Sequence, residues 1–254
     1  MNFEKTNIEE QKACSPLEQL ANQAETLDSN SLNASLEGVN RASLWESVSD
    51  YFKGSYVNVK DFFTDTSDEI ALQELGSPFY ETREFGLDKC SEAAKATFTP
   101  SVIYNWMNFS PGKRQEISNA YAAKVAEAFE LENYRGVYFE DLDPGIGGYN
   151  NGDGSIHISN NILSAYGSPM EVVDVITHEL RHQYQNECIH GHHNVPDEVR
   201  KEWAQAMAIY DSNSQPWAYD PWGYKYNPLE IDSRYAGETV VRNMTKDIIN
   251  EQMA

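Results

Sequence analysis

The chain has 254 residues and a formal net charge of −21, from 19 Lys and Arg against 40 Asp and Glu. This charge repels phosphate backbones and argues against a nucleic-acid partner. Hydrophobic residues make up 40% of the chain, which is enough for a packed core and excludes wholesale disorder. The length fits one large domain, or a domain of about 150 residues with an extension.

Neither the N-terminus nor any later stretch has the apolar length of a signal peptide or a membrane span. We therefore expect a soluble protein without membrane insertion, either cytoplasmic or exported without a signal peptide recognisable in this chain. The three cysteines, Cys14, Cys90 and Cys188, form neither a disulfide framework nor a CxxC metal cluster. A reducing compartment is the simpler interpretation, and a single disulfide is the alternative.

The first hundred residues contain short segments with helical apolar spacing, separated by polar residues. Helices are predicted over 16–27, 43–52 and 68–76. No candidate site falls in this part of the chain. We therefore predict a helical N-terminal extension of unknown role over residues 1–105 and a second domain over residues 106–254.

The second domain begins with a more regular pattern. Residues 110–131 predict a long amphipathic helix with apolar side chains four apart on one face. Strands follow at 136–141 and 155–159. The Gly- and Asn-rich segment between them predicts a hairpin turn rather than a calcium loop, because the EF-hand ligand spacing is missing. Three further helices are predicted, opening at Pro169, Pro196 and Pro228.

The helix that opens at Pro169 contains the sequence HELRH, residues 178–182. Positions i and i+4 lie on one helix face, so His178 and His182 can aim two nitrogens at one point about 2 Å from each, the zinc–nitrogen distance. Glu179 lies beside that point and could take a proton from a zinc-bound water. Ordinary surface contacts are the alternative for these residues. The position of the motif within a capped helix that also has an apolar face favours the metal site.

A catalytic zinc usually has three protein ligands and one water, so a third ligand is needed. The metzincin spacing fails, because Cys188 stands where the third histidine would be and Gln185 where a glycine is expected. The loop after the helix contains three further histidines, and we interpret them as solvated side chains rather than as zinc ligands: His190, His192 and His193. The remaining candidate is a carboxylate on a downstream helix.

The segment NPLEIDSRYAGE, residues 227–238, resembles the glutamate helix of small bacterial and phage-type zincin metallopeptidases of the HExxH-plus-Glu (gluzincin-like) kind. In these proteins the HELxH helix is followed by Pro-x-Glu-x-Asp-Ala-x-x-Phe-Ala. This chain has Ser233 in place of the first alanine. The residues at the other positions of the pattern are Pro228, Glu230, Asp232, Tyr235 and Ala236. The resemblance covers about residues 110–250. It implies an α+β zincin-like domain with a small mixed sheet, one Zn²⁺ per chain, and Glu230 as third ligand.

Other roles are open for the residues around this segment. Glu230 could instead cap the start of its own helix. Asp232 is the reserve ligand, and otherwise we expect it to accept a hydrogen bond from a metal-bound histidine and fix its tautomer. One of three tyrosines near Glu230 could stabilise the oxyanion of the reaction: Tyr224, Tyr226 and Tyr235. For each of them, ordinary packing is the alternative.

The expected activity is zinc-dependent hydrolysis of a protein or peptide substrate, with Glu179 as general base. The resemblance implies that the substrate lies extended along the strand at 155–159, held by backbone hydrogen bonds. A non-catalytic zinc-binding or partner-binding module, or an effector on the same fold, is the first alternative. A structural zinc site completed by Cys188 or a loop histidine is the second. Cys14 could also block the zinc in a latent form.

Overall fold

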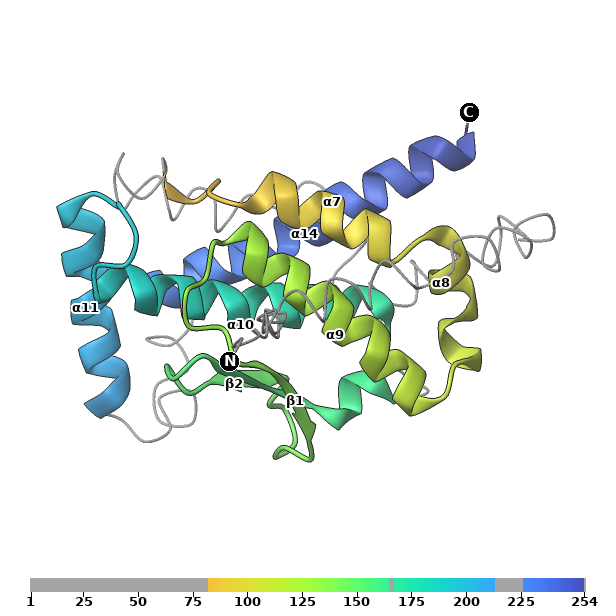
Figure 1. The fold of residues 1–254 in the computed structure, drawn as a ribbon, viewed down its shortest axis with the longest axis horizontal. Coiled ribbons are helices and arrows are strands. Elements are labelled where there is room, and N and C mark those ends of the chain that lie inside the picture. Colours follow the sequence, from red (N-terminus) through yellow and green to blue (C-terminus); the bar gives the residue numbers. More distant parts are fainter. Residues whose placement is uncertain (1–81, 165–166, 213–225, 254) are drawn as a thin grey trace, which may run out of the picture.

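The structure is a computed structural model that describes residues 82–164, 167–212 and 226–253 (Figure 1). The helices predicted before residue 82, together with Cys14 and Tyr224, lie outside the described residues. The described helices and strands are, in chain order, α7 (Leu87–Thr97), α8 (Pro100–Asn105), the 3-10 turn η2 (Trp106–Asn108), α9 (Pro111–Ala128), β1 (Gly136–Glu140), β2 (Gly148–Asn150), β3 (Ser155–Ser159), the 3-10 turn η3 (Asn160–Leu163), α10 (Pro169–Ile189), α11 (Asp197–Ser212) and α14 (Pro228–Met253).

The sheet has three strands in the order β1-β3-β2. β1 runs parallel to β3, and β2 runs antiparallel to it, so the sheet is mixed. Helices with a small three-stranded sheet agree with the predicted α+β class. One expectation is wrong: the strand at 155–159 is the central strand β3, with both edges paired, so no substrate can add to it. The two edge strands are β1 and β2, and β2 lies in the segment that the sequence pattern assigned to a turn.

Two of the predicted helices begin at the caps that the sequence indicates. The Ser110 hydroxyl accepts a hydrogen bond from the Lys113 N–H at the start of α9, and the Ser168 hydroxyl accepts one from the Met170 N–H at the start of α10. A proline follows each serine at the first helical position, where its missing N–H costs nothing. The apolar face predicted for α9 is buried: Ile117, Tyr121, Val125 and Phe129.

Helix α10 runs through the middle of the molecule, with the sheet on one side and α7 and α14 on the other (Figure 1). Its side chains Val172, Ile176 and Leu180 are fully buried, as their i, i+4 spacing predicts. The HELRH helix is therefore held on several sides by packed elements. Among the described residues, no helix is long and apolar enough to cross a membrane.

The described residues before 106 share one hydrophobic core with the rest of the chain. Leu87, Phe98 and Val102 belong to the same cluster of buried side chains as α10. The ring of Phe98 lies 5.8 Å from that of Trp106 and 5.4 Å from that of Tyr121, between ring centroids. Helix α7 also packs against α9 and α14. The core therefore continues across the boundary at 105/106 that the change of sequence pattern suggested.

Helices α10 and α14 approach each other closely at Gly237. A Cβ atom at this position would clash with Asp174 Oδ1 and lie 2.9 Å from the Asp174 backbone oxygen. Real Cβ atoms are essentially never found so close to a neighbouring atom. The missing side chain of Gly237 thus lets α14 lie directly against α10, which carries HELRH.

We expect Gly237→Ala to lower the free energy of unfolding by about 1–3 kcal/mol, because the added methyl group overpacks this helix crossing. Gly112→Ala is the matched control, since Gly112 is also helical and has nothing within 4 Å of its Cβ position. That change should raise stability by up to about 1 kcal/mol through helix propensity alone. Urea unfolding of both variants measures the difference. Equal stabilisation by the two changes would mean that the helices are not in such close contact.

Candidate metal centre

Three side chains from two helices converge at one point. His178 and His182 come from α10, and Glu230 comes from the first turn of α14. The two Nε2 atoms are 3.1 Å apart. Glu230 Oε2 lies 3.5 Å from His178 Nε2, and Oε1 lies 3.3 Å from His182 Nε2. Among the described residues, this is the group of His, Cys, Asp and Glu side chains whose ligand atoms are close enough to hold a metal ion.

The size of this triangle fits a zinc ion. Bonds of about 2.0–2.2 Å in a tetrahedron place neighbouring ligand atoms about 3.3–3.6 Å apart. The observed separations of 3.1–3.5 Å therefore need only small shifts to hold the ion. Two imidazoles and one carboxylate are also the donor set of catalytic zinc sites, which keep a fourth position for water or substrate.

The charges at this point agree with a cation site. Burial alone would raise the pKa of Glu230, but His182 and His178 outweigh it and hold the pKa well below its usual value. Burial alone would likewise lower the pKa of His182, but the charge and hydrogen bond of Glu230, with Glu179 and Gln185, raise it to about 9. A buried carboxylate, 1% exposed, thus lies beside two imidazoles, and a metal ion could take the place of a proton between these groups.

Glu230 does more than begin a helix. At the start of α14, the Asn227 side-chain oxygen accepts a hydrogen bond from the Leu229 N–H at 2.9 Å, and the Asn227 backbone oxygen accepts one from the Ile231 N–H at 3.0 Å. These are the contacts of an N-cap residue. The Glu230 carboxylate extends from the same turn to both histidines on α10. The helix start therefore has its own cap, and the geometry places Glu230 in the cluster.

Asp232 does not contact His182 directly, because the side chain of Gln185 lies between them. His182 Nδ1 lies 2.9 Å from Gln185 Oε1, and the Gln185 amide nitrogen donates to Asp232 Oδ2 at 2.7 Å. Asp232 is in turn bound by Arg181 at 2.8 Å. Gln185 is thus the direct partner of the histidine, and sequence reasoning missed both Gln185 and Arg181. Gln185 lies one turn after His182 on α10, but the contacts of Gln185 and Arg181 with Asp232 cross to α14, and no local pattern indicates them.

The tyrosine candidates are placed elsewhere. The Tyr235 hydroxyl donates to Glu84 Oε1 at 2.7 Å, and the Arg83 guanidinium lies over its ring, 5.0 Å from the centroid. Tyr226 is 60% exposed. Neither of them lines the cleft at the cluster. The described tyrosine candidates therefore do not reach the position that an oxyanion stabiliser would need.

The candidates that would complete a structural zinc site lie outside the cluster. Cys188 is fully buried, and burial raises its pKa to about 12. Each loop histidine is hydrogen-bonded to a different oxygen at 2.8–3.0 Å: His190 to the Asn186 backbone, His192 to Glu132 and His193 to Glu187. His190 and His192 are exposed, as expected of solvated loop side chains, whereas His193 is half-buried.

The cluster opens into a cleft of about 760 Å³. One wall is the segment Gly145–Gly152, which includes β2, and the other walls come from α10, α14 and Met207 of α11. Glu179 lines this cleft beside His178. A Cβ atom on Gly148 would lie 3.0 Å from the Glu179 side chain, so β2 passes directly against the predicted general base.

Strand β2 presents an open edge to solvent space in the described part of the chain. Ser159 N–H donates to the Gly147 oxygen, and Asn151 N–H is directed at the Ser155 oxygen at 3.5 Å. Because backbone groups alternate in an antiparallel pair, those of Gly148 and Asn150 are directed away from β3. The wall of the cleft therefore includes unpaired backbone donors and acceptors of an edge strand.

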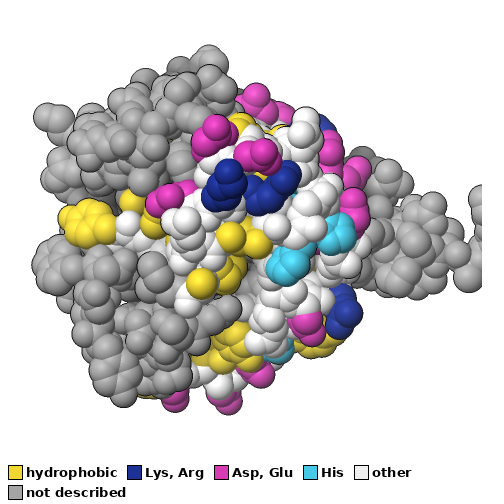
Figure 2. Space-filling model, turned by 90° about the vertical axis from the view of Figure 1, so that its left-hand side faces the viewer, with side chains coloured by type: hydrophobic (Ala, Val, Ile, Leu, Met, Phe, Trp, Pro, Cys, Tyr) yellow, Lys and Arg dark blue, Asp and Glu magenta, His cyan; other side chains and the backbone are white. Residues whose placement is uncertain are grey.

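The face at the α11 end of the molecule mixes basic, acidic, histidine and hydrophobic side chains (Figure 2). On the described part of this face, the few Lys and Arg side chains do not join into an extended patch of the kind that binds phosphate backbones. The absence of a nucleic-acid partner stays a prediction from the net charge.

The chain was compared with protein-family models, with curated proteins and with solved structures, and none of the three comparisons found a match. The geometry and chemistry of the cleft are therefore the basis for a functional proposal.

Proposed function

We propose that the protein is a zinc-dependent metallopeptidase of the HExxH-plus-Glu type, with a zincin-like arrangement of the active-site helix. The observation that carries this proposal is the triangle of His178, His182 and Glu230, with ligand atoms 3.1–3.5 Å apart. Both histidines line an open cleft. The cleft also contains a buried carboxylate, Glu179, in the position of a general base. A site that only binds metal has no need of that group.

Each residue has a defined task in this proposal. The two histidines and Glu230 would hold one Zn²⁺, which supplies a Lewis acid and a water whose pKa is lowered to about 7. Glu179 would accept a proton from the attacking water and return it to the leaving amine. Burial raises the pKa of Glu179, with His178 and His182 only partly opposing it. A carboxylate with a raised pKa is a stronger base, which suits the acceptance of a proton from water.

The substrate in this proposal is an extended peptide that adds to the open edge of β2. The backbone groups of Gly148 and Asn150 would pair with it, as in other cases of strand addition. The Asn150 side chain donates to the Glu179 backbone oxygen at 3.3 Å and to Gln183 at 3.2 Å, which fixes β2 against α10. A peptide on this edge would therefore lie at a set distance from Glu179.

The direct test is hydrolysis of a mixed peptide library by the zinc-loaded full chain, read by mass spectrometry. We expect new peptide termini, their loss after treatment with a chelator, and their return after addition of zinc. A chain that binds one zinc but cleaves no peptide would support the partner-binding module instead. Cleavage that persists without metal would contradict the proposed role of the three ligands.

A further inference from the structure

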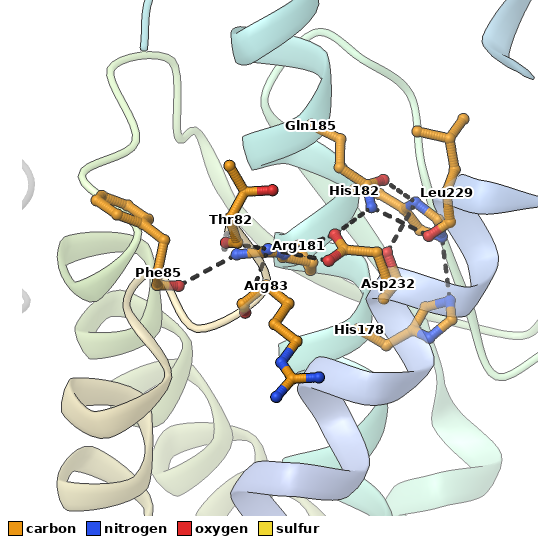
Figure 3. A network of polar contacts seen from close by, with 10 residues as sticks. Thr82, Arg83, Phe85, His178, Arg181, His182, Gln185, Leu229 and Asp232 are labelled. Carbon is orange, nitrogen blue, oxygen red and sulfur yellow. Dashed lines mark hydrogen bonds and ion pairs between the residues drawn. The ribbon is translucent and has the colours of Figure 1, made fainter. Parts of the chain in front are cut away.

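Arg181 is the last of the three residues between His178 and His182 in HELRH, and it is 0% exposed. Its Nε donates to Asp232 Oδ2 at 2.8 Å and its Nη2 to Asp232 Oδ1 at 3.0 Å, a bidentate pair. On the other side, the guanidinium donates to the backbone oxygens of Thr82 and Phe85, each at 3.1 Å (Figure 3). Arg181 thus joins the turn before α7 to α14 through the middle of the fold.

The Arg181–Asp232 pair determines how the Gln185 amide is turned. A guanidinium only donates, so both Asp232 oxygens act here as acceptors. Gln185 lies 2.7 Å from Asp232 Oδ2 and 3.0 Å from the Leu229 backbone oxygen, which also only accepts. The group that Gln185 directs at these two oxygens must therefore be its NH₂ group.

The orientation of Gln185 then determines the tautomer of His182. With its NH₂ group turned to Asp232 and Leu229, Gln185 presents Oε1 to His182 Nδ1, at 2.9 Å. An amide oxygen only accepts, so Nδ1 carries the proton and donates it. In the neutral imidazole, the form that binds a metal, the lone pair is then on Nε2, the atom that faces His178 and Glu230. Figure 3 shows these contacts in sequence, from the turn at Thr82–Phe85 to the histidines.

We propose that Arg181, Asp232 and Gln185 form a positioning relay that holds His182 in the tautomer and ring orientation required for metal binding. The inference rests on the metal centre of the proposed function and is independent of peptide hydrolysis. It also assigns the turn at residues 82–85 to the support of the metal centre, since its carbonyl groups complete the hydrogen bonds of Arg181.

A role in stability alone explains this arrangement poorly. Replacing a buried ion pair by apolar side chains of similar volume is often neutral or stabilising, because the pair has to be removed from water. A chain of donors and acceptors that ends on one nitrogen of a metal ligand is, by contrast, the usual way in which such ligands are oriented. The direction of every hydrogen bond in the relay follows from groups that can act in only one sense.

Gln185→Met tests the relay, because methionine has a similar shape and makes no hydrogen bond to His182 or Asp232. We expect the zinc affinity to fall about 10- to 100-fold, the usual effect of losing a group that orients a ligand. Gln183→Met is the matched control for zinc affinity: Gln183 is a buried glutamine of the same helix. Its amide donates to Glu187 and accepts from Asn150, and neither partner belongs to the relay. This control should keep the zinc affinity within about threefold, well below the effect of a lost orienting group.

Two further measurements separate positioning from folding. In long-range ¹H–¹⁵N spectra of the zinc-loaded chain, His182 should carry its proton on Nδ1, and Gln185→Met should broaden or shift this signal. Asp232→Asn should also weaken zinc binding, although Asp232 does not touch His182, because an amide at this position lets the Gln185 side chain turn over. Ser233→Ala removes the other polar atom near Nδ1, at 3.1 Å, and should have little effect.

The outcomes distinguish the relay from the proposed enzyme. Unchanged zinc affinity in Gln185→Met, or an equal loss in Gln183→Met, would overturn the relay. Zinc binding with the expected variant effects but no peptide hydrolysis would reject the proposed function and support the relay. A wild-type chain that binds no zinc would overturn both.

Discussion

Glu179→Gln is expected to lower the rate of peptide hydrolysis by about 10²- to 10⁴-fold, the usual contribution of a general acid–base group. Glutamine has the same shape as glutamate but cannot take a proton from water. Glu179 is not one of the three clustered ligands, so the variant should still bind one zinc per chain. The measurement is kcat on a peptide cleaved by the wild type, together with the zinc content of both proteins.

Glu127→Gln is a suitable control for this change, since Glu127 is an exposed residue of α9 that does not line the cleft. Its activity should equal that of the wild type. If Glu179→Gln kept its metal and full activity, Glu179 would have no role in proton transfer. If the wild type hydrolysed no peptide, and Glu179→Gln kept its metal and every biological effect of the chain, the binding module would be the better explanation.

Glu230→Ala is expected to reduce zinc affinity by more than about 100-fold, because it removes a ligand, and even the loss of a group that only orients a ligand costs 10- to 100-fold. The zinc content of the wild type should be close to one per chain after dialysis, and that of the variant close to zero. Both proteins have to be folded, which circular dichroism checks. The expected loss follows from the contacts of the Glu230 carboxylate with both histidines at 3.3–3.5 Å.

Glu171→Ala is the matched control for the capping explanation. Glu171 is the third residue of α10, as Glu230 is of α14, so each change removes a carboxylate from the first turn of a helix. We expect Glu171→Ala to bind zinc like the wild type and to lose up to about 1 kcal/mol of stability, as for other favourable helix-end charges. Full zinc binding by Glu230→Ala would assign Glu230 to the helix start and point to Asp232 or the loop histidines as ligands.

Local sequence patterns were sufficient to predict helix α10, which carries HELRH. Ser168 and Pro169 predict where α10 begins, and its i, i+4 apolar residues predict the buried face that the structure has. His178 and His182 share one face because of the helical repeat alone. These features depend on residues within two or three turns of each other, so the chain carries them whatever its overall fold.

The position of β2 required the tertiary structure. Its three residues lie in a Gly- and Asn-rich segment that by itself favours a turn, and they become a strand only because β3 supplies a partner. Which strand is central and which is the edge depends on the order of all three strands. The expectation that the strand at 155–159 is an edge strand was therefore wrong.

The sequence by itself determined the two histidines, the glutamate between them, and the helix that holds them. The candidate third ligand, Glu230, was named only through a resemblance, and the contacts of Arg181 and Gln185 were not visible at all. Their partners Leu229 and Asp232 lie on α14, and they come within hydrogen-bond distance only because α14 packs directly against α10. Helical periodicity specifies which side chains share a face, whereas contacts between distant helices depend on how the whole core packs.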